Sequence, residues 1–380
     1  MKLAQGVWPG LPSTQDAVGL MAIAPQLAWV FADAAHLAQP DALSRLQAAL
    51  PGVTLVGCST AGEIGRDGVG DGGVVITAMH LEHPGFRVVV TDLNGMADSA
   101  AAGERLGRAL ASDPVHAVVV LGQGVEINGS ALIDGLEGAL PEHVPVSGGL
   151  AGDGGAFRQT WTVSNQAVSP HQIVALGLTD PHIELRHGTF HGWQPFGVMR
   201  RVTRAQGNVL YELDGEPALA VYKRYLGDHA RELPSSGLLF PFEMLGPDCA
   251  DLGLIRTILG IDEAQGSLIL AGDIVPDGYL RLMHATRSSL VDGAEVAAEQ
   301  LMTQGLPAGP GLSLLISCVG RKLVLGSQVD EEVEAVADVL GRDTWVAGFY
   351  SYGEISPMLS GQDCRLHNQT MTITHISERA

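Results

Sequence analysis

The sequence is organised around the stretch GCSTAGE, which occupies Gly57–Glu63. Two related stretches follow it, SGGLAGD at Ser147–Asp153 and GFYSYGE at Gly348–Glu354. Each follows a short apolar run of β-type residues and ends in a glycine and an acid. A repeat of this kind indicates a structural element that recurs along the chain. We therefore predict three strands, each of which ends at a turn that carries a carboxylate.

The segments before the repeats share one order of predicted elements: strand, helix, strand. These elements are 27–31, 41–50 and 53–56 before the first repeat, 117–121, 128–140 and 144–146 before the second, and 312–317, 330–340 and 345–347 before the third. Other strand pairs have the pattern of antiparallel hairpins, including one around Gly207-Asn208. This pattern predicts an α/β (or α+β) fold with mixed β-sheets, helices packed outside and two halves.

Length and composition limit the class of protein. A chain of 380 residues with 46% hydrophobic and 17% charged residues is typical of a well-buried protein with two or three domains. Its formal net charge of −20 opposes binding to phosphate backbones and to anionic membrane surfaces. We therefore expect a partner that is neither a nucleic acid nor a membrane.

Cysteine spacing and hydropathy bear on the compartment. The residues Met1–Trp8 lack the apolar core of a signal peptide, and no run approaches the roughly 18–20 apolar residues of a membrane span. Cys58, Cys249, Cys318 and Cys364 are widely spaced and form no C-x-x-C pair, so neither a disulfide framework nor a zinc site is indicated. These observations predict a reduced, cytoplasmic setting.

The acids that end the repeats are the first candidates for a site. Glu63, Asp153 and Glu354 are expected at equivalent strand ends, where open sheets bind ligands. A structural role is also open, because an acid in a glycine turn accepts hydrogen bonds from nearby backbone N–H groups. Repetition is consistent with either shared role.

Cys58 and Ser59 raise the question of a nucleophile. A G-x-S-x-G elbow needs glycine two residues on each side of the serine, and Ala61 stands at the second place. No partner His–Asp pair is identifiable, and small residues that pack at a strand end are the alternative. Tyr222, Tyr225, Tyr350 and Tyr352 could form the walls of a pocket or pack in a core.

Histidines offer a possible metal or haem ligand. His187 and His191 are four residues apart, but Gly188 and Gly192 argue against a helix and no third ligand stands nearby. A haem needs only one axial histidine, for which His187, His191 and His367 are candidates. A hydrogen-bonded structural role is the alternative for each.

Six ordered stretches resemble the FIST family (F-box and intracellular signal transduction). They are Val56–Ile64, Val146–Asp153, Glu212–Ala218 with Tyr222, Cys318–Arg321, Leu366–Thr370 and Gly348–Pro357. The resemblance spans about residues 25–376 and implies a FIST N-terminal domain at 25–215 and a FIST C-terminal domain at 216–376. It also implies a sensor of small molecules such as amino acids, encoded with or fused to histidine kinases, chemoreceptors or cyclic-di-GMP enzymes. A subset of the family resembles haem proteins that sense nitric oxide.

The leading hypothesis is a non-enzymatic bacterial sensor that binds a small ligand between its halves and acts on a separate protein, such as the histidine kinase of a two-component system. The candidate ligand-binding residues are Cys58, Ser59, Thr60, Glu63, Asp153, Tyr222, Tyr350, Tyr352 and Glu354. A haem-based nitric oxide sensor that regulates a histidine kinase or cyclic-di-GMP enzyme is the second hypothesis. A hydrolase or transferase that uses Cys58 or Ser59 is the third.

Overall fold

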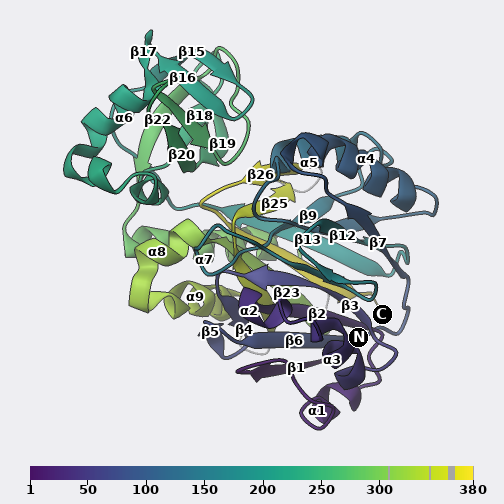
Figure 1. Cartoon of the computed structure of the whole chain (residues 1–380). Coiled ribbons are helices and arrows are strands. Elements are labelled where there is room, and N and C mark those ends of the chain that lie inside the picture. The colour runs from purple at the N-terminus through teal and green to yellow at the C-terminus, as the bar shows by residue number, and fades with distance from the viewer. Residues whose placement is uncertain (307–308, 342–343, 358–363, 380) are drawn as a thin grey trace.

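A computed structural model of the chain describes residues 1–306, 309–341, 344–357 and 364–379. The chain forms a large body and a small lobe, which are joined by a narrow connection (Figure 1). The body consists of three α/β units that follow one another in the sequence, and the lobe is inserted into the third unit. Both termini lie together at one end of the body (Figure 1), where the amino group of Met1 is 2.8 Å from Glu378.

The three units share one order of elements: an edge strand, two parallel strands with helices before and between them, a hairpin and a returning antiparallel strand. The first unit contains β1 (Lys2–Trp8), α1 (Val18–Met21), β2 (Leu27–Asp33), α2 (Ala34–Leu37), α3 (Ala42–Ala49), β3 (Thr54–Thr60), β4 (Glu63–Gly65), β5 (Gly68–Gly70) and β6 (Val74–His80). The second contains β7 (Phe86–Asp92), α4 (Ser99–Leu110), β8 (Ala117–Gly122), α5 (Gly129–Glu137), β9 (Val146–Leu150), β10 (Thr162–Ser164), β11 (Val168–Ser169) and β12 (Gln172–Leu178). The third contains β13 (Ile183–Phe190), α7 (Arg287–Thr303), β23 (Gly311–Cys318), α8 (Val319–Leu325), α9 (Asp330–Leu340), β24 (Trp345–Ser351), β25 (Gly353–Pro357), β26 (Cys364–His367) and β27 (Met371–Glu378).

The units exchange their hairpins. Each unit keeps four strands in its own sheet, in the orders β1-β6-β2-β3, β7-β12-β8-β9 and β13-β27-β23-β24. The hairpin β4-β5 extends the third sheet through β24, β25-β26 extends the second through β9, and β10-β11 extends the first through β3. The exchange runs in a closed circle, so no unit can leave the body without breaking strand pairs of both others.

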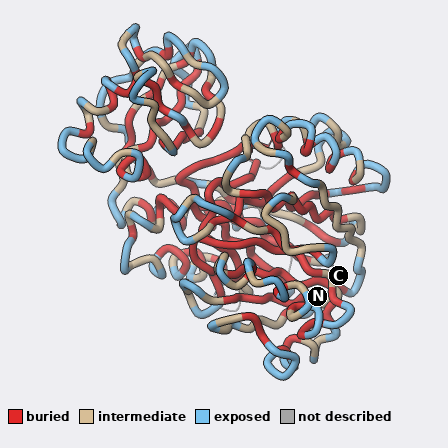
Figure 2. Tube along the Cα trace, viewed as in Figure 1, coloured by how far each residue is buried: buried red, intermediate tan, exposed pale blue. Residues whose placement is uncertain are grey.

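One hydrophobic core lies between the three sheets. Trp29 and Phe31 from the first sheet, Val119 from the second, and Leu314 and Phe349 from the third pack together there. The outer faces of the sheets are covered by α1–α3, by α4 and α5, and by α7–α9, each over an apolar cluster of its own. Figure 2 shows buried strands inside and exposed helical surfaces outside. The predicted fold class of mixed sheets with outer helices is confirmed.

The lobe has its own sheet and core. It contains β14 (Gln194–Pro195), β15 (Arg200–Gln206), β16 (Val209–Leu213), β17 (Glu216–Pro217), α6 (Ala218–Leu226), β18 (Phe242–Leu245), β19 (Asp251–Arg256), β20 (Ile258–Asp262), β21 (Ser267–Leu270) and β22 (Tyr279–His284). Gln194 pairs with His284, so the chain enters and leaves the lobe through adjacent strands. The predicted turn at Gly207-Asn208 joins β15 to β16. The predicted boundary between residues 215 and 216 lies inside this lobe.

Candidate functional site

The three repeats meet at one end of the central core. Backbone hydrogen bonds join each repeat to another, among them Ala61 N to Tyr350 O (2.8 Å), Tyr352 N to Leu150 O (3.0 Å) and Gly152 N to Ser59 O (2.9 Å). The strands also run further than the sequence predicts, because β3 continues to Thr60, β9 to Leu150 and β24 to Ser351. Most of each repeat is therefore strand, and the turn comes only at its end.

A glycine in each repeat allows a close approach of two parallel strands. A Cβ atom would lie 1.9 Å from the carbonyl oxygen of Val30 at Gly57, 1.8 Å from that of Val120 at Gly148 and 1.8 Å from that of Leu315 at Gly348. These three glycines face equivalent residues of the neighbouring strands. The repeat therefore encodes a packing contact that excludes every larger side chain.

This strand pairing shows that the acid of the second repeat is offset by one residue from the acids of the other two. Gly148 is equivalent to Gly57 and Gly348 by strand pairing, yet Asp153 follows its glycine by five residues whereas Glu63 and Glu354 follow theirs by six. The sequence predicts three equivalent acids, but only Glu63 and Glu354 are structurally equivalent.

The two equivalent acids are buried and hydrogen-bonded in the same way. Glu63 accepts from the Thr60 hydroxyl at 2.5 Å and from the backbone N–H of Gly73 at 3.0 Å. Glu354 accepts from the Ser351 hydroxyl at 2.5 Å and from the N–H of Thr370 at 3.2 Å. Burial raises the pKa of both carboxyl groups, that of Glu354 to about 8. Each carboxyl group therefore links the end of one strand to the residue just before a later strand, β6 for Glu63 and β27 for Glu354.

Asp153 also holds a turn in place, but through different hydrogen bonds. Its carboxylate accepts hydrogen bonds from the backbone N–H groups of Phe157, Arg158 and Gln159, and the Tyr352 hydroxyl donates to it. Phe157 stacks on Tyr352 with ring centroids 4.1 Å apart. The hydrogen-bonding atoms of the Asp153 carboxylate and the Tyr352 phenol are therefore occupied by contacts within the protein.

The candidate nucleophiles are enclosed. Cys58 is fully buried in the central core, and burial raises the pKa of its thiol well above the usual range. The Ser59 hydroxyl donates to Gly152 O at 2.7 Å and accepts from Trp161 N at 2.9 Å. Neither group meets a described cavity, and a thiolate nucleophile needs both access and a lowered pKa.

The candidate tyrosines do not converge on one cavity. Tyr222 lies in the core of the lobe, where its hydroxyl donates to Phe240 O at 2.8 Å. Tyr350 lies in the body, where its hydroxyl donates to Glu332 at 2.5 Å. Tyr350 and Tyr352 belong to the packed end of the core, as described above for their repeat.

Two of the candidate histidines, His187 and His367, are buried on strands, whereas His191 is half-buried in the segment after β13. His187 lies on β13 with its Nε2 atom unpartnered, and His191 Nδ1 accepts from Trp193 N at 2.9 Å. His367 Nε2 bonds Ser356 O at 2.9 Å. Burial lowers the pKa of all three imidazoles to about 4, so they are neutral at physiological pH.

The surroundings of these histidines offer little support for a haem. A haem needs a flat apolar slot beside its axial ligand, and none of the three lines the four cavities of about 730, 330, 200 and 390 Å³. The unpartnered Nε2 of His187 belongs to a buried side chain on β13, a strand that pairs with β27.

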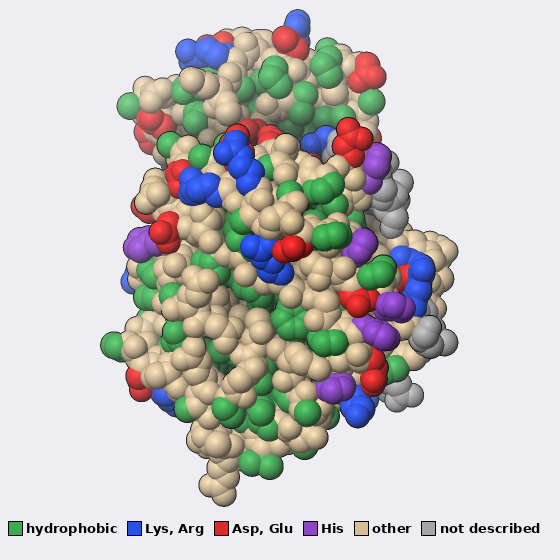
Figure 3. Space-filling view, turned by 90° about the vertical axis from the view of Figure 1, so that its right-hand side faces the viewer, with side chains coloured by type: hydrophobic (Ala, Val, Ile, Leu, Met, Phe, Trp, Pro, Cys, Tyr) green, Lys and Arg blue, Asp and Glu red, His purple; other side chains and the backbone are tan. Residues whose placement is uncertain are grey.

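A cavity of about 730 Å³ lies between the lobe and the body. Its apolar walls include Met244, Leu252 and Ile274 from the lobe, and Ile133 and Leu366 from the body. Figure 3 shows the lobe as the upper part of the molecule, directly above the body. This volume and this apolar lining are typical of small-molecule sites, which add only a few polar groups to fix orientation.

Arg256 supplies the main polar group of this cleft. It is 4% exposed, and it donates from Nε to Asp273 O and from Nη1 to Leu366 O, both at 3.0 Å. Among the described residues, its Nη2 atom has no hydrogen-bond partner and no carboxylate forms an ion pair with it. Burial lowers the pKa of Arg256 to about 10, which leaves the guanidinium charged at neutral pH.

Asp273 ties the lobe to the body beside Arg256. Its Oδ1 atom accepts from Asn128 Nδ2 at 3.1 Å, and its backbone N–H is 3.5 Å from the Ser130 hydroxyl. Asn128 is the N-cap of α5, since its side chain accepts from Ala131 N. Ser130 and Asp134 of α5 line the cleft. The walls of the cleft therefore carry two arginines, Arg256 and Arg365, and two acids, Asp134 and Asp273.

The segment Leu366–Thr370 connects the cleft to the third repeat. It comprises the end of β26 and the turn that leads to β27. Besides the bond from Arg256, Gln369 Nε2 donates to Leu238 O of the lobe at 2.8 Å, Trp193 Nε1 donates to Gln369 O at 3.0 Å, and Thr370 N donates to Glu354. Asn368 Oδ1 and Gln369 Oε1 are buried without a partner. A change in the cleft can therefore reach the repeat through this segment.

A second, smaller cavity of about 330 Å³ lies at the surface beside Glu63. Trp8, Asp67 and Asp71 also line it. Asp71 forms an ion pair with Lys322, and Glu63 is held as described above. This cavity presents no buried charge that lacks a partner among the described residues, which makes the cleft at Arg256 the better candidate.

Arg256 and Asp273 are the functional candidates that the sequence analysis missed. A signal for Arg256 was present, because it is a lone charge in the apolar run Leu254–Ile258. Asp273 stands in an ordinary turn segment, Ala271–Pro276, and carried no such signal.

The comparison with protein families gives a direct result. Residues 26–216 match the FIST N domain, and residues 218–357 match the FIST C domain. The chain therefore belongs to the FIST family, which is a family of signal-transduction sensors. Within the described residues, no helix has the length and apolarity that crossing a bilayer requires.

Individual relatives add little on function. An uncharacterized protein of Mycobacterium tuberculosis is 25% identical over 343 residues, which cover 88% of this chain and 87% of that protein. An uncharacterized protein of Methanocaldococcus jannaschii is 36% identical over 83 residues, which cover 22% of this chain and 15% of that protein. A cyanuric acid hydrolase from A. caulinodans aligns with 100% of this chain and 99% of its own, at a TM-score of 0.36 and 12% identity, values too low to support an argument.

Proposed function

We propose that this FIST protein is a non-enzymatic sensor that binds a small carboxylate-bearing molecule, such as an amino acid, in the cleft between lobe and body. The observation that carries the proposal is the buried guanidinium of Arg256 in an apolar-walled cavity of about 730 Å³, with Nη2 unpartnered among the described residues. A buried charge is costly unless it is paired, so this site gains from an anionic partner.

The remaining polar groups of the cleft support a zwitterionic ligand. Arginine binds carboxylates through adjacent N–H groups, and Arg256 has Nη2 available for such a bond. Asp134 and Asp273 line the same cavity and would attract an ammonium group. The apolar side chains Met244, Leu252 and Ile274 would cover an aliphatic part.

The connection between lobe and body supports signalling by closure. The chain crosses between them on β14 and the end of β22, and the other contacts include the bond of Asn128 to Asp273 and the bond of Gln369 to Leu238. A ligand that touches both walls binds the closed arrangement better and shifts the population toward it. A separate protein, such as a histidine kinase or a cyclic-di-GMP enzyme, would respond to that arrangement.

A thermal-shift screen tests the proposal. The wild-type chain is heated with each member of a library of amino acids and other small carboxylates, because a ligand that binds only the folded state raises the melting temperature. We expect stabilisation by at least one compound. Leu252→Trp, which fills the cleft, should lose that stabilisation, whereas Leu259→Trp, at an exposed position on β20, should keep it. No stabilising compound, or equal stabilisation of both variants, would contradict the proposal.

A further inference from the structure

We infer that His83, Asp180 and His182 form a binding site for one divalent transition-metal ion of the Zn²⁺ type, at the end of the body that holds both termini. One ligand atom from each residue can be chosen so that all three lie within 4.8 Å of one another. This site is separate from the cleft, and it does not depend on the proposed function.

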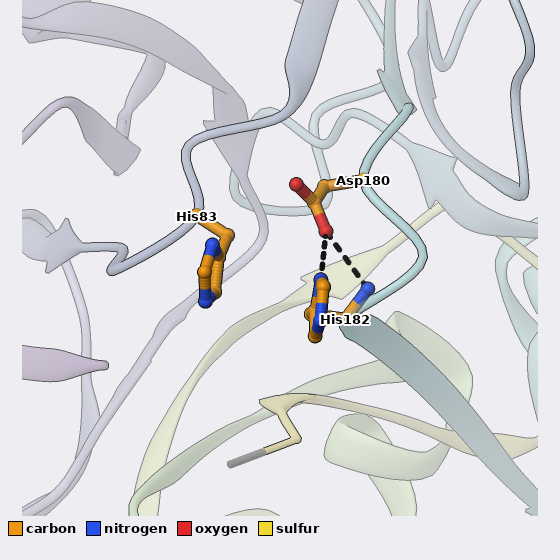
Figure 4. A group of neighbouring side chains, drawn as sticks. All are labelled: His83, Asp180 and His182. Carbon is orange, nitrogen blue, oxygen red and sulfur yellow. Dashed lines mark hydrogen bonds and ion pairs between the residues drawn. The ribbon is translucent and has the colours of Figure 1, made fainter.

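The imidazole rings of His83 and His182 lie side by side, and the carboxylate of Asp180 is directed at His182 (Figure 4). The imidazole rings of His83 and His182 stack with centroids 4.4 Å apart, and His182 Nδ1 is 2.7 Å from Asp180 Oδ1. Two ligands of one zinc ion are each about 2.1 Å from it, and so about 3.4 Å from each other in a tetrahedral site. The imidazoles of His83 and His182 are exposed, so their side chains can rotate to bring the three ligand atoms to that spacing.

Backbone contacts hold the two loops in place. Gly85 O accepts from Thr179 N at 2.9 Å, and a Cβ atom on Gly85 would lie 2.3 Å from the Cβ atom of Asp180. His83 N donates to the Glu378 carboxylate at 2.9 Å, and Asp180 Oδ1 accepts from His182 N at 2.8 Å. The ligands are therefore brought together before any ion binds, which lowers the entropy lost on binding.

The donor set selects the class of ion. Two imidazole nitrogens and one carboxylate oxygen suit Zn²⁺ and similar divalent ions, whereas Mg²⁺ and Ca²⁺ prefer oxygen ligands alone. Three protein ligands leave a position for water, as in open zinc sites. The formal net charge of −20 further favours the approach of a cation.

The position of the site gives the ion a structural consequence. His83 lies in the connection from the first unit to the second, and Asp180 and His182 lie in the connection from the second to the third. Because β6 and β12 run antiparallel to β2 and β8, these connections lie at the end of the core opposite the repeats. An ion bound here would link the connections of all three units and stabilise the folded body.

Competition with a chromophoric chelator for Zn²⁺ tests the site. The protein carries no histidine tag and has the substitution Cys249→Ser, because the exposed thiol of Cys249 would bind zinc on its own. We expect one Zn²⁺ per chain and a melting temperature that rises with Zn²⁺. His83→Gln, His182→Gln and Asp180→Asn should each weaken binding at least tenfold and remove the rise.

His171→Gln is the matched control, since His171 is exposed at a distance from the cluster in the loop before β12. It should bind Zn²⁺ as the parent does. Circular dichroism of each variant without metal confirms that the fold is kept, so that weaker binding reports the lost ligand. Failure of the parent to bind one ion, unchanged binding in all three cluster variants, or equal weakening by His171→Gln would overturn the inference.

Discussion

Two regions of the molecule differ in whether their buried polar groups have hydrogen-bond partners. One is the end of the core where the repeats meet, and the other is the cleft between lobe and body. At the repeats, Glu63, Asp153 and Glu354 each accept at least two hydrogen bonds from the protein itself. In the cleft, Arg256 is buried but has Nη2 unpartnered among the described residues. Repetition in this sequence therefore indicates how the fold closes, and the candidate ligand site lies in a segment that occurs once.

The largest expected effect concerns the buried ion pair that supports the third repeat. Arg321 Nη2 is 2.7 Å from Glu332, both side chains are fully buried, and Tyr350 donates to the same carboxylate. Glu332→Gln leaves the guanidinium uncompensated, so we expect a loss of about 3–5 kcal/mol in the free energy of unfolding, measured in urea.

Glu104→Gln is the control for that experiment, because it removes the exposed pair with Arg108. Its effect should stay below about 0.5 kcal/mol. If Glu332→Gln lost less than about 1 kcal/mol, the repeat end would not be the closed, fully paired region described above.

Glycine packing between the parallel strands should give the next largest effect. Gly57→Ala places a methyl group 1.9 Å from the carbonyl oxygen of Val30. Because this oxygen belongs to the backbone of a paired strand, it cannot move away as a flexible side chain could. We expect a loss of about 3 kcal/mol by chemical denaturation. Gly19→Ala in α1 meets no atom within 4 Å and should be neutral or slightly stabilising. Equal effects of the two substitutions would show that the repeat does not require glycine.

A pH dependence should follow from Glu354. Burial raises its pKa to about 8, above the ordinary value of 4.5, so the folded state holds a proton that the unfolded state releases. Stability from this group is therefore present at low pH and lost as pH rises toward 8. Buried histidines with a pKa of about 4 act in the opposite direction, but only below about pH 6.5.

The measurement for Glu354 therefore belongs between pH 6.5 and 8. Relative to Glu354→Gln, the wild type should lose about 2 kcal/mol across that window in urea unfolding. The exposed Glu299→Gln should show no such difference from wild type. Parallel pH profiles of wild type and Glu354→Gln would mean that the carboxyl group of Glu354 is ionised in the folded protein.

Thiol labelling should show the smallest effect. Among the four cysteines only Cys249 is exposed, and Cys58 is buried in the core. A disulfide reagent should label the native chain rapidly at Cys249, so Cys249→Ser removes the rapid phase and Cys58→Ser leaves it unchanged. Rapid labelling of Cys58 in the native protein would instead support the hydrolase or transferase hypothesis.

Local patterns predicted the elements but not their assembly. The predicted helices at 41–50, 128–140 and 330–340 correspond to α3, α5 and α9, because their apolar spacing reflects the buried face of each helix. The exchange of hairpins between units left no trace in the sequence, since a hairpin has the same pattern whichever sheet it joins. Long-range pairing of this kind depends on the whole fold.

The candidate site was predicted in part for a similar reason. The segment Leu366–Thr370 was recognised from its resemblance to the family and does border the cleft through Leu366. Tyr222 and Tyr350 are both amphipathic, which predicts that they share the wall of one pocket, but they lie in separate cores. A sequence shows which side chains can bind a ligand, whereas burial decides which of them still have a free polar atom.

Calorimetric titration of the cleft tests the central claim most directly. The titrant is the library compound that gives the largest thermal shift with wild-type protein. We expect one molecule bound per chain by wild type and by Leu259→Trp, and no binding by Leu252→Trp, because Leu252 lines the cleft and Leu259 lies on the exposed strand β20. Undiminished binding by Leu252→Trp would contradict the account and place the ligand elsewhere.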